Sequence, residues 1–186
     1  MITEDDLNAV RALGIRFPKA FVQHLKRADV QQYLREILMQ IPADAALEDL
    51  SCSEFDRLLG ARSAAWTAWD ELSNCLKSAK GRAPLVGASK LLAAKRLRLV
   101  PLEDSYIRRS LGRSRDIWKI IHCIVRDPQV REGLERVRRE VPSASHITLH
   151  RTLDIIAWRK HQGHCCQAGA SRACLPGTPW FRGPRA

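Results

Sequence analysis

The organisation of the chain follows from residues 84–112, which read PLVGASKLLAAKRLRLVPLEDSYIRRSLG. Residues 84–87 have the composition of a tight turn, and a basic helix is expected over about 88–96. Pro101 interrupts this pattern, and Asp104 is well placed to begin the next helix, because a short carboxylate accepts hydrogen bonds from the free amides of a helix start. The stretch therefore predicts two basic helices on either side of a proline-containing turn.

Apolar residues outside this stretch recur at three- and four-residue spacing, which is typical of helices that face a core. The strongest pattern covers residues 62–80, where Trp66 and Trp69 fit a core better than a base-stacking platform. A second pattern, which begins at Ser114, is apolar on most of its circumference and indicates a central helix. Asp154 lies among apolar neighbours of the last expected helix, where a carboxylate requires a cationic partner.

These patterns predict an all-α fold, because no alternation of period two is long enough for a strand. We expect a single compact bundle of about seven to nine helices in residues 1–162. Residues that commonly begin helices support this helical fold, because Thr3, Asp29 and Asp127 are each placed to cap a helix. Residues 163–186 are rich in Gly, Pro, Ala and Cys without a period, so we interpret them as a disordered tail.

Positive charge is concentrated in the C-terminal two thirds of the chain. Of the net charge of +11, residues 1–60 contribute seven Lys/Arg against ten Asp/Glu, whereas residues 61–186 contain 24 against ten. Such an excess favours a polyanionic partner, and nucleic acid is the commonest one in a cytoplasm. The alternative is that arginine simply replaces lysine on solvated faces.

Several classes of protein are not indicated. No apolar run approaches the ~18 residues that cross a bilayer, and the acidic start MITEDD differs from a signal peptide, so we expect a cytoplasmic protein without a membrane partner. Motifs of the Walker, dinucleotide-binding, Gly-x-Ser-x-Gly and His-Glu-x-x-His types are missing. His161, His164, Cys165, Cys166 and Cys174 are zinc-type ligands at unfavourable spacing, so neither a metal nor a cofactor is predicted.

Residues 86–104, VGASKLLAAKRLRLVPLED, resemble the hallmark G-x-x-x-A-S-K-L-L-x-x-K-R-P-R-L-x-P-x-x-D of a family of uncharacterised actinobacterial proteins. The resemblance extends from residues 2–7 to the helix that contains Leu153 and Trp158. Leu97 stands where that family has proline. The resemblance implies that the chain has the fold of this family. It implies no function, because the family has none attached to it.

The same stretch is similar, over about 30 residues, to the helix-hairpin-helix DNA glycosylases, in which a glycine hairpin grips backbone phosphate. Gly87 matches the second hairpin glycine, and Leu85 stands where the first should be. Asp104 matches the catalytic aspartate, and Lys90 lies one position from the usual lysine. The resemblance implies that Asp104 would stabilise the cationic sugar of a departing base or activate water, and that Lys90 would attack the anomeric carbon.

The leading hypothesis is nucleic-acid binding, of DNA or another nucleic acid, with base-excision chemistry as its more specific form. Asp104 and Lys90 are then the candidate catalytic residues. The candidate binding residues are Gly87, Ser89, Lys95, Arg96, Arg98, Arg108 and Arg109. The alternative is a structural or protein-interaction domain, in which Asp104 is a helix cap and internal counter-ion and the basic face meets an acidic protein partner.

Overall fold

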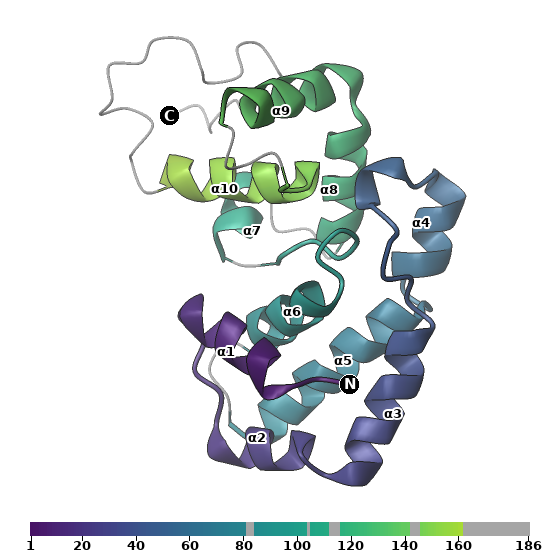
Figure 1. The fold of residues 1–186 in the computed structure, drawn as a ribbon, viewed down its shortest axis with the longest axis vertical. Helices are drawn as coiled ribbons and strands as arrows, with labels where there is room; N and C mark the ends of the chain where they lie inside the picture. Colours follow the sequence, from purple (N-terminus) through teal and green to yellow (C-terminus); the bar gives the residue numbers. More distant parts are fainter. Residues whose placement is uncertain (81–83, 104, 112–115, 142–145, 162–186) are drawn as a thin grey trace. The chain divides into compact units, whose positions relative to one another are not determined.

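The computed structural model describes residues 1–80, 84–103, 105–111, 116–141 and 146–161 (Figure 1). All regular secondary structure in these ranges is helical, and they contain no strand. The predicted all-α fold is therefore confirmed. The expected tail, residues 163–186, lies outside the described residues.

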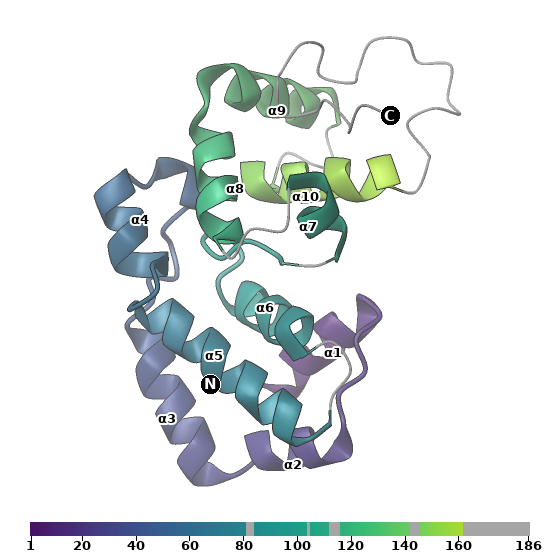
Figure 2. The same cartoon turned by 180° about the vertical axis from the view of Figure 1, so that it is seen from behind.

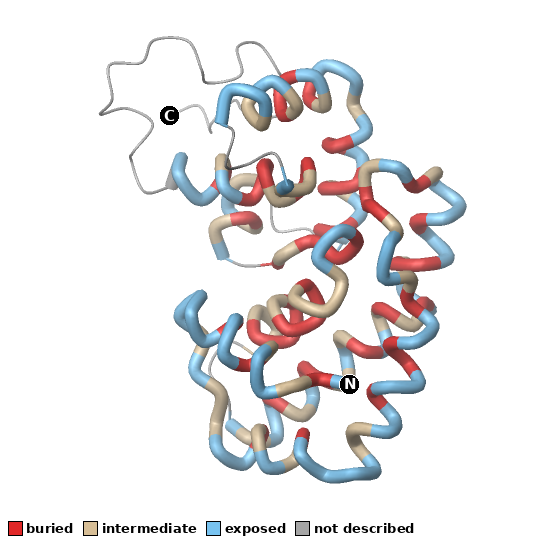
Figure 3. Tube along the Cα trace, in the orientation of Figure 1, coloured by how far each residue is buried: buried red, intermediate tan, exposed pale blue. Residues whose placement is uncertain are grey.

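The chain divides into two compact units, Met1–Glu103 (unit 1) and Asp104–Ala186 (unit 2). In each unit the buried positions follow one side of the helices and the exposed positions follow the other (Figure 3). Each unit has its own apolar core. That residues 1–162 form a single domain stays a prediction.

Unit 1 is built around its longest helix, α5, which packs against α6, α3 and α4, while α6 also packs against α1 (Figure 2). The side of α5 that faces this core consists of small and aliphatic residues. Trp66 and Trp69 lie at its edge and are half-buried rather than fully enclosed, with ring centroids 5.2 Å apart. The elements of unit 1 are α1 (Glu4–Ala12), α2 (Lys19–Leu25), α3 (Ala28–Met39), η1 (Leu47–Asp49), α4 (Cys52–Leu59), α5 (Ala64–Ser78) and α6 (Pro84–Lys95).

Three helices of unit 1, α1, α4 and α5, begin with a side-chain cap. The side chain of Thr3 accepts from the amide of Asp6, and the Asp6 carboxylate accepts from the amide of Thr3, which is a complete capping box. Asp29 does not cap α3, contrary to expectation. The helix begins at Ala28, so Asp29 lies inside it, and the Asp29 carboxylate pairs instead with the guanidinium of Arg27 at 2.6 Å.

Unit 2 contains α7 (Ser105–Leu111), α8 (Ile117–Arg126), α9 (Pro128–Glu140) and α10 (Leu149–His161). Asp127 caps α9 through the amides of Gln129 and Val130, as expected. The predicted central helix is α8, which buries six side chains. These side chains are Ile117, Trp118, Ile121, His122, Ile124 and Val125.

The cationic partner predicted for Asp154 is present on the same helix. Arg151 Nη1 lies 3.0 Å from Asp154 Oδ2, and both side chains are largely buried. Burial lowers the pKa of Arg151, and the neighbouring Asp154 carboxylate acts in the opposite direction by favouring the charged guanidinium. None of the helices in the described ranges is both long and apolar enough to cross a membrane.

Replacing Gly60 by alanine should destabilise the protein, because an added Cβ would lie 2.3 Å from the carbonyl oxygen of Asp56 in α4. We expect a loss of about 1–3 kcal/mol, typical of overpacking, measured by urea denaturation. Gly14→Ala is the matched control. Gly14 has a φ of +82°, and no neighbour lies within 4 Å of the added Cβ. The alanine substitution there therefore introduces backbone strain without a steric clash. A loss below about 1 kcal/mol at Gly60 would contradict the close contact.

Candidate nucleic-acid interface

The first turn of α6 replaces the tight turn predicted for residues 84–87. α6 begins at Pro84, which suits a helix start because proline has no amide hydrogen and a fixed φ. The prediction of a turn was wrong for this reason. Gly87 is buried in the helix, and an added Cβ would lie 3.0 Å from Leu76 Cδ1 of α5. The glycine therefore permits the close approach of two helices.

Ser89 is also internal. Its hydroxyl accepts a hydrogen bond of 2.8 Å from the amide of Glu103, and both residues are buried. This bond ties the end of the loop that follows α6 back to the helix. A buried serine with this partner has a structural role in unit 1.

Arg96 closes the end of a neighbouring helix. Its Nε donates to the carbonyl of Ile41 at 2.8 Å, one Nη donates to the carbonyl of Lys95 at 2.8 Å, and the other donates to the carbonyl of Leu38. The last carbonyls of a helix have no partner within it, so the guanidinium satisfies groups at the C-terminal end of α3. Burial lowers the pKa of Arg96.

The two lysines of α6 turn toward α1 and the residues that follow it. Lys95 Nζ lies 2.6 Å from Asp6 Oδ2, and Lys90 Nζ donates to the carbonyl of Leu13 at 3.3 Å. Burial alone would raise the pKa of Asp6, but the hydrogen bonds from Lys95 and Thr3 outweigh it, so this pKa is lowered. Lys95 is therefore already engaged by a carboxylate.

The remaining predicted residues are divided between the units. Arg98 is exposed in unit 1, whereas Arg108 is half-buried and Arg109 is exposed on α7 of unit 2. Asp104 lies outside the described residues, so the structure gives no distance between it and Lys90. The catalytic assignment of these two residues stays a prediction.

The excess charge belongs mainly to unit 2. Residues 1–103 contain 15 Lys/Arg and 13 Asp/Glu, whereas residues 104–161 contain 13 and 7. We define the arginine set of unit 2 as four exposed side chains. They are Arg109 on α7, Arg136 and Arg139 on α9, and Arg159 on α10.

Three packed helices carry this arginine set. α10 packs against both α7 and α9, and the C-terminal ends of α9 and α10 lie at the same end of unit 2 (Figures 1 and 2). α9 buries Val130, Gly133 and Leu134, which leaves Arg136 and Arg139 outside its apolar stripe. The binding residues predicted from the sequence all lie within residues 84–112 and include none from α9. The signal that identifies Arg136 and Arg139 is their position opposite the buried stripe.

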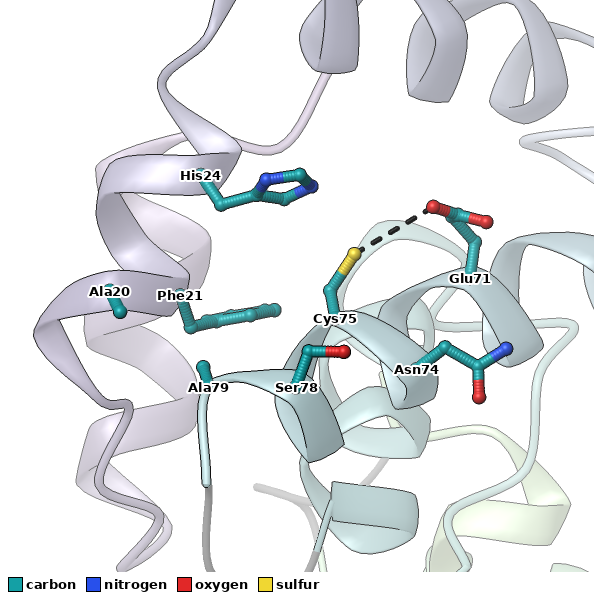
Figure 4. Close-up of a pocket in the computed structure, with 8 residues that line it drawn as sticks. All are labelled: Ala20, Phe21, His24, Glu71, Asn74, Cys75, Ser78 and Ala79. Atoms are coloured by element: carbon teal, nitrogen blue, oxygen red, sulfur yellow. Dashed lines mark hydrogen bonds between the residues drawn. The ribbon is translucent and has the colours of Figure 1, made fainter.

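A separate pocket of about 370 Å³ lies between α2 and α5 (Figure 4). Its lining includes Phe21, His24, Glu71 and Cys75. Cys75 Sγ donates to Glu71 Oε1 at 3.7 Å. Burial, with a smaller contribution from the Glu71 charge, raises the pKa of Cys75 to about 11. Cys75 is thus a neutral thiol at physiological pH, which is unsuited to nucleophilic or metal-thiolate chemistry.

Among the residues that the structure describes, no group of three or more His, Cys, Asp or Glu is placed to hold a metal ion. The cysteines and His164 of the C-terminal cluster lie outside those residues.

In comparisons with known proteins, the model of a family of unknown function (DUF6308) matches residues 1–161. No curated protein and no solved structure gives a significant match.

Lys95→Gln should lower the free energy of unfolding at pH 7 by about 1 kcal/mol, as expected for a partly exposed ion pair. The pKa of folded Asp6 lies below its ordinary value of 3.8, so the pair stabilises the fold above that pH and loses this effect as the pH falls through the folded pKa. Denaturation of both proteins over a pH series should show their difference shrinking in acid. Lys80→Gln, at an exposed position, is the control. A difference that stayed constant into strong acid would argue against the pairing.

Glu71→Gln should accelerate alkylation of Cys75, because it removes a charge that raises the pKa of the thiol. In the wild type at pH 8, Cys75 should react with iodoacetamide more slowly than the exposed Cys52 and Cys123. Peptide-resolved mass spectrometry measures each rate in one sample. The Cys52 rate should be the same in both proteins, and a Cys75 rate unaffected by the substitution would remove the assigned role of Glu71.

Proposed function

We propose that this chain, which belongs to the family of unknown function DUF6308, binds nucleic acid through the arginine set of unit 2. The observation that carries the proposal is the uneven charge. Residues 104–161 have a clear excess of Lys and Arg over Asp and Glu, whereas residues 1–103 are almost balanced. Positive charges that repel one another within a small unit are stabilised by a polyanion.

The chemistry of the side chains supports phosphate as the group that is bound. Guanidinium groups present planar pairs of donors that match phosphate oxygens, and they keep their charge at any physiological pH. Arg109, Arg136, Arg139 and Arg159 are all exposed, so a ligand can reach them without unfolding any element. Contacts of this kind give affinity with steep salt dependence and little sequence preference.

The proposal keeps some of the residues selected from the sequence and replaces others. Arg109 remains in the interface, and the exposed Arg98 and the half-buried Arg108 stay candidates. Lys95 and Arg96 are replaced, because their side chains bind Asp6 and the carbonyls at the end of α3. Base-excision chemistry by Asp104 and Lys90 is not required by the proposal and stays a separate prediction.

A variant with Arg109, Arg136, Arg139 and Arg159 all changed to glutamine should bind nucleic acid at least about tenfold more weakly at moderate salt. Each phosphate contact that is lost should reduce the slope of log affinity against log salt by about 0.7–0.9. Fluorescence anisotropy with a labelled oligonucleotide of about 20 nucleotides, between about 50 and 200 mM salt, measures both quantities.

The matched control changes Arg16, Lys19, Arg62 and Lys80 to glutamine. It removes the same charge from exposed positions of unit 1, and it should bind nearly as the wild type does. Equal losses in the two variants would show a response to total charge rather than a site in unit 2. No binding by the wild type at low salt would exclude the proposal and favour an acidic protein partner.

A further inference from the structure

The solvent-facing side of α10 carries an aromatic side chain beside one of the arginines. Trp158 is 40% exposed and Ile155 is 47% exposed, while Leu149, Leu153 and Ala157 of the same helix are buried. The Arg159 guanidinium lies 5.8 Å from the centre of the Trp158 ring. α10 therefore presents a flat aromatic surface together with a cation.

Among the described residues of unit 2, the other tryptophan is not exposed. Trp118 of α8 is only 3% exposed, in the core of the same unit. Burying an aromatic side chain stabilises a fold, and a tryptophan left half in water forgoes part of that gain. A surface tryptophan beside an arginine is an arrangement that proteins use for stacking on bases, with arginine adding cation–π attraction.

We infer that unit 2 binds an unpaired nucleic-acid strand, with a base stacked on Trp158 and the neighbouring phosphates held by the arginine set. This inference rests on the proposed function and specifies its ligand. Charge complementarity selects the strand over a neutral partner, since Arg136 and Arg139 lie on the helix packed against α10. Unpairing is required because the bases of a duplex are stacked on one another and offer no free face.

The two kinds of contact make different contributions, which allows them to be separated. The arginines contribute the salt-dependent part of the affinity, whereas stacking is nearly independent of salt and accepts any base. A duplex would meet the arginines alone. Unit 2 should therefore prefer a single strand over a duplex of the same sequence.

Trp158→Ala should weaken binding of a labelled oligo(dT) by about 5- to 150-fold, the range for loss of one stacked base. Its affinity for a matched duplex and the salt slope for oligo(dT) should stay those of the wild type. Trp158→Phe should restore most of the loss, because phenylalanine keeps an aromatic face. Ile155→Ser is the control, since it removes an exposed apolar side chain three residues away without removing a ring.

Melting temperatures of the variants show whether they remain folded, and the Trp158→Phe protein keeps the test valid if the alanine variant unfolds. A Trp158→Ala protein that binds oligo(dT) as the wild type does, or that loses duplex affinity equally, would overturn the stacking inference. If the wild type binds neither ligand at low salt, the proposed function itself fails. If it binds both equally and only the arginine variant is weakened, the proposed function stands and the inference fails.

Discussion

Unit 1 depends on the guanidinium of Arg96. Its donors reach the carbonyls of Leu38 and Ile41 at the end of α3 and the carbonyl of Lys95 at the end of α6. One side chain thus completes the ends of two helices that are more than 50 residues apart in sequence. Burial opposes its charge, but these hydrogen bonds compensate by giving the part-buried guanidinium three carbonyl acceptors. The most densely charged part of the sequence is therefore partly an internal framework.

The sequence predicted what local chemistry determines. It correctly predicted the Thr3 and Asp127 caps, the apolar circumference of α8 and the need of Asp154 for a cation. Each of these features depends on residues only a few positions apart. The assignment of Arg96 and Lys95 to a nucleic-acid surface stays a prediction, but the sequence did not reveal that both side chains have partners within the fold. Their partners lie on α3 and α1, and no periodicity within residues 84–112 reveals a partner so distant in the chain. The packing role of Gly87 was missed for the same reason, since its partner Leu76 lies on another helix.

The separation of the charges changes how the net charge of +11 is to be interpreted. In unit 1 basic and acidic side chains are nearly equal in number, and several of the basic ones have identified partners in the fold. In unit 2 they are unequal, and Arg109, Arg136, Arg139 and Arg159 are exposed. A charge count along the sequence finds the region of highest density. A count by structural unit finds the region where charge is available to a ligand.

The close approach of α5 and α6 has an evolutionary consequence. The space between the helices at Gly87 is limited by a single methyl group, Leu76 Cδ1, at 3.0 Å from the place of a Cβ. A side chain at position 87 would require Leu76 to shift by a few tenths of an ångström, so the sizes of the residues at positions 87 and 76 are coupled. Relatives of this chain should vary the two positions together, so that glycine at 87 accompanies a large residue at 76, while alanine or serine at 87 accompanies a smaller one.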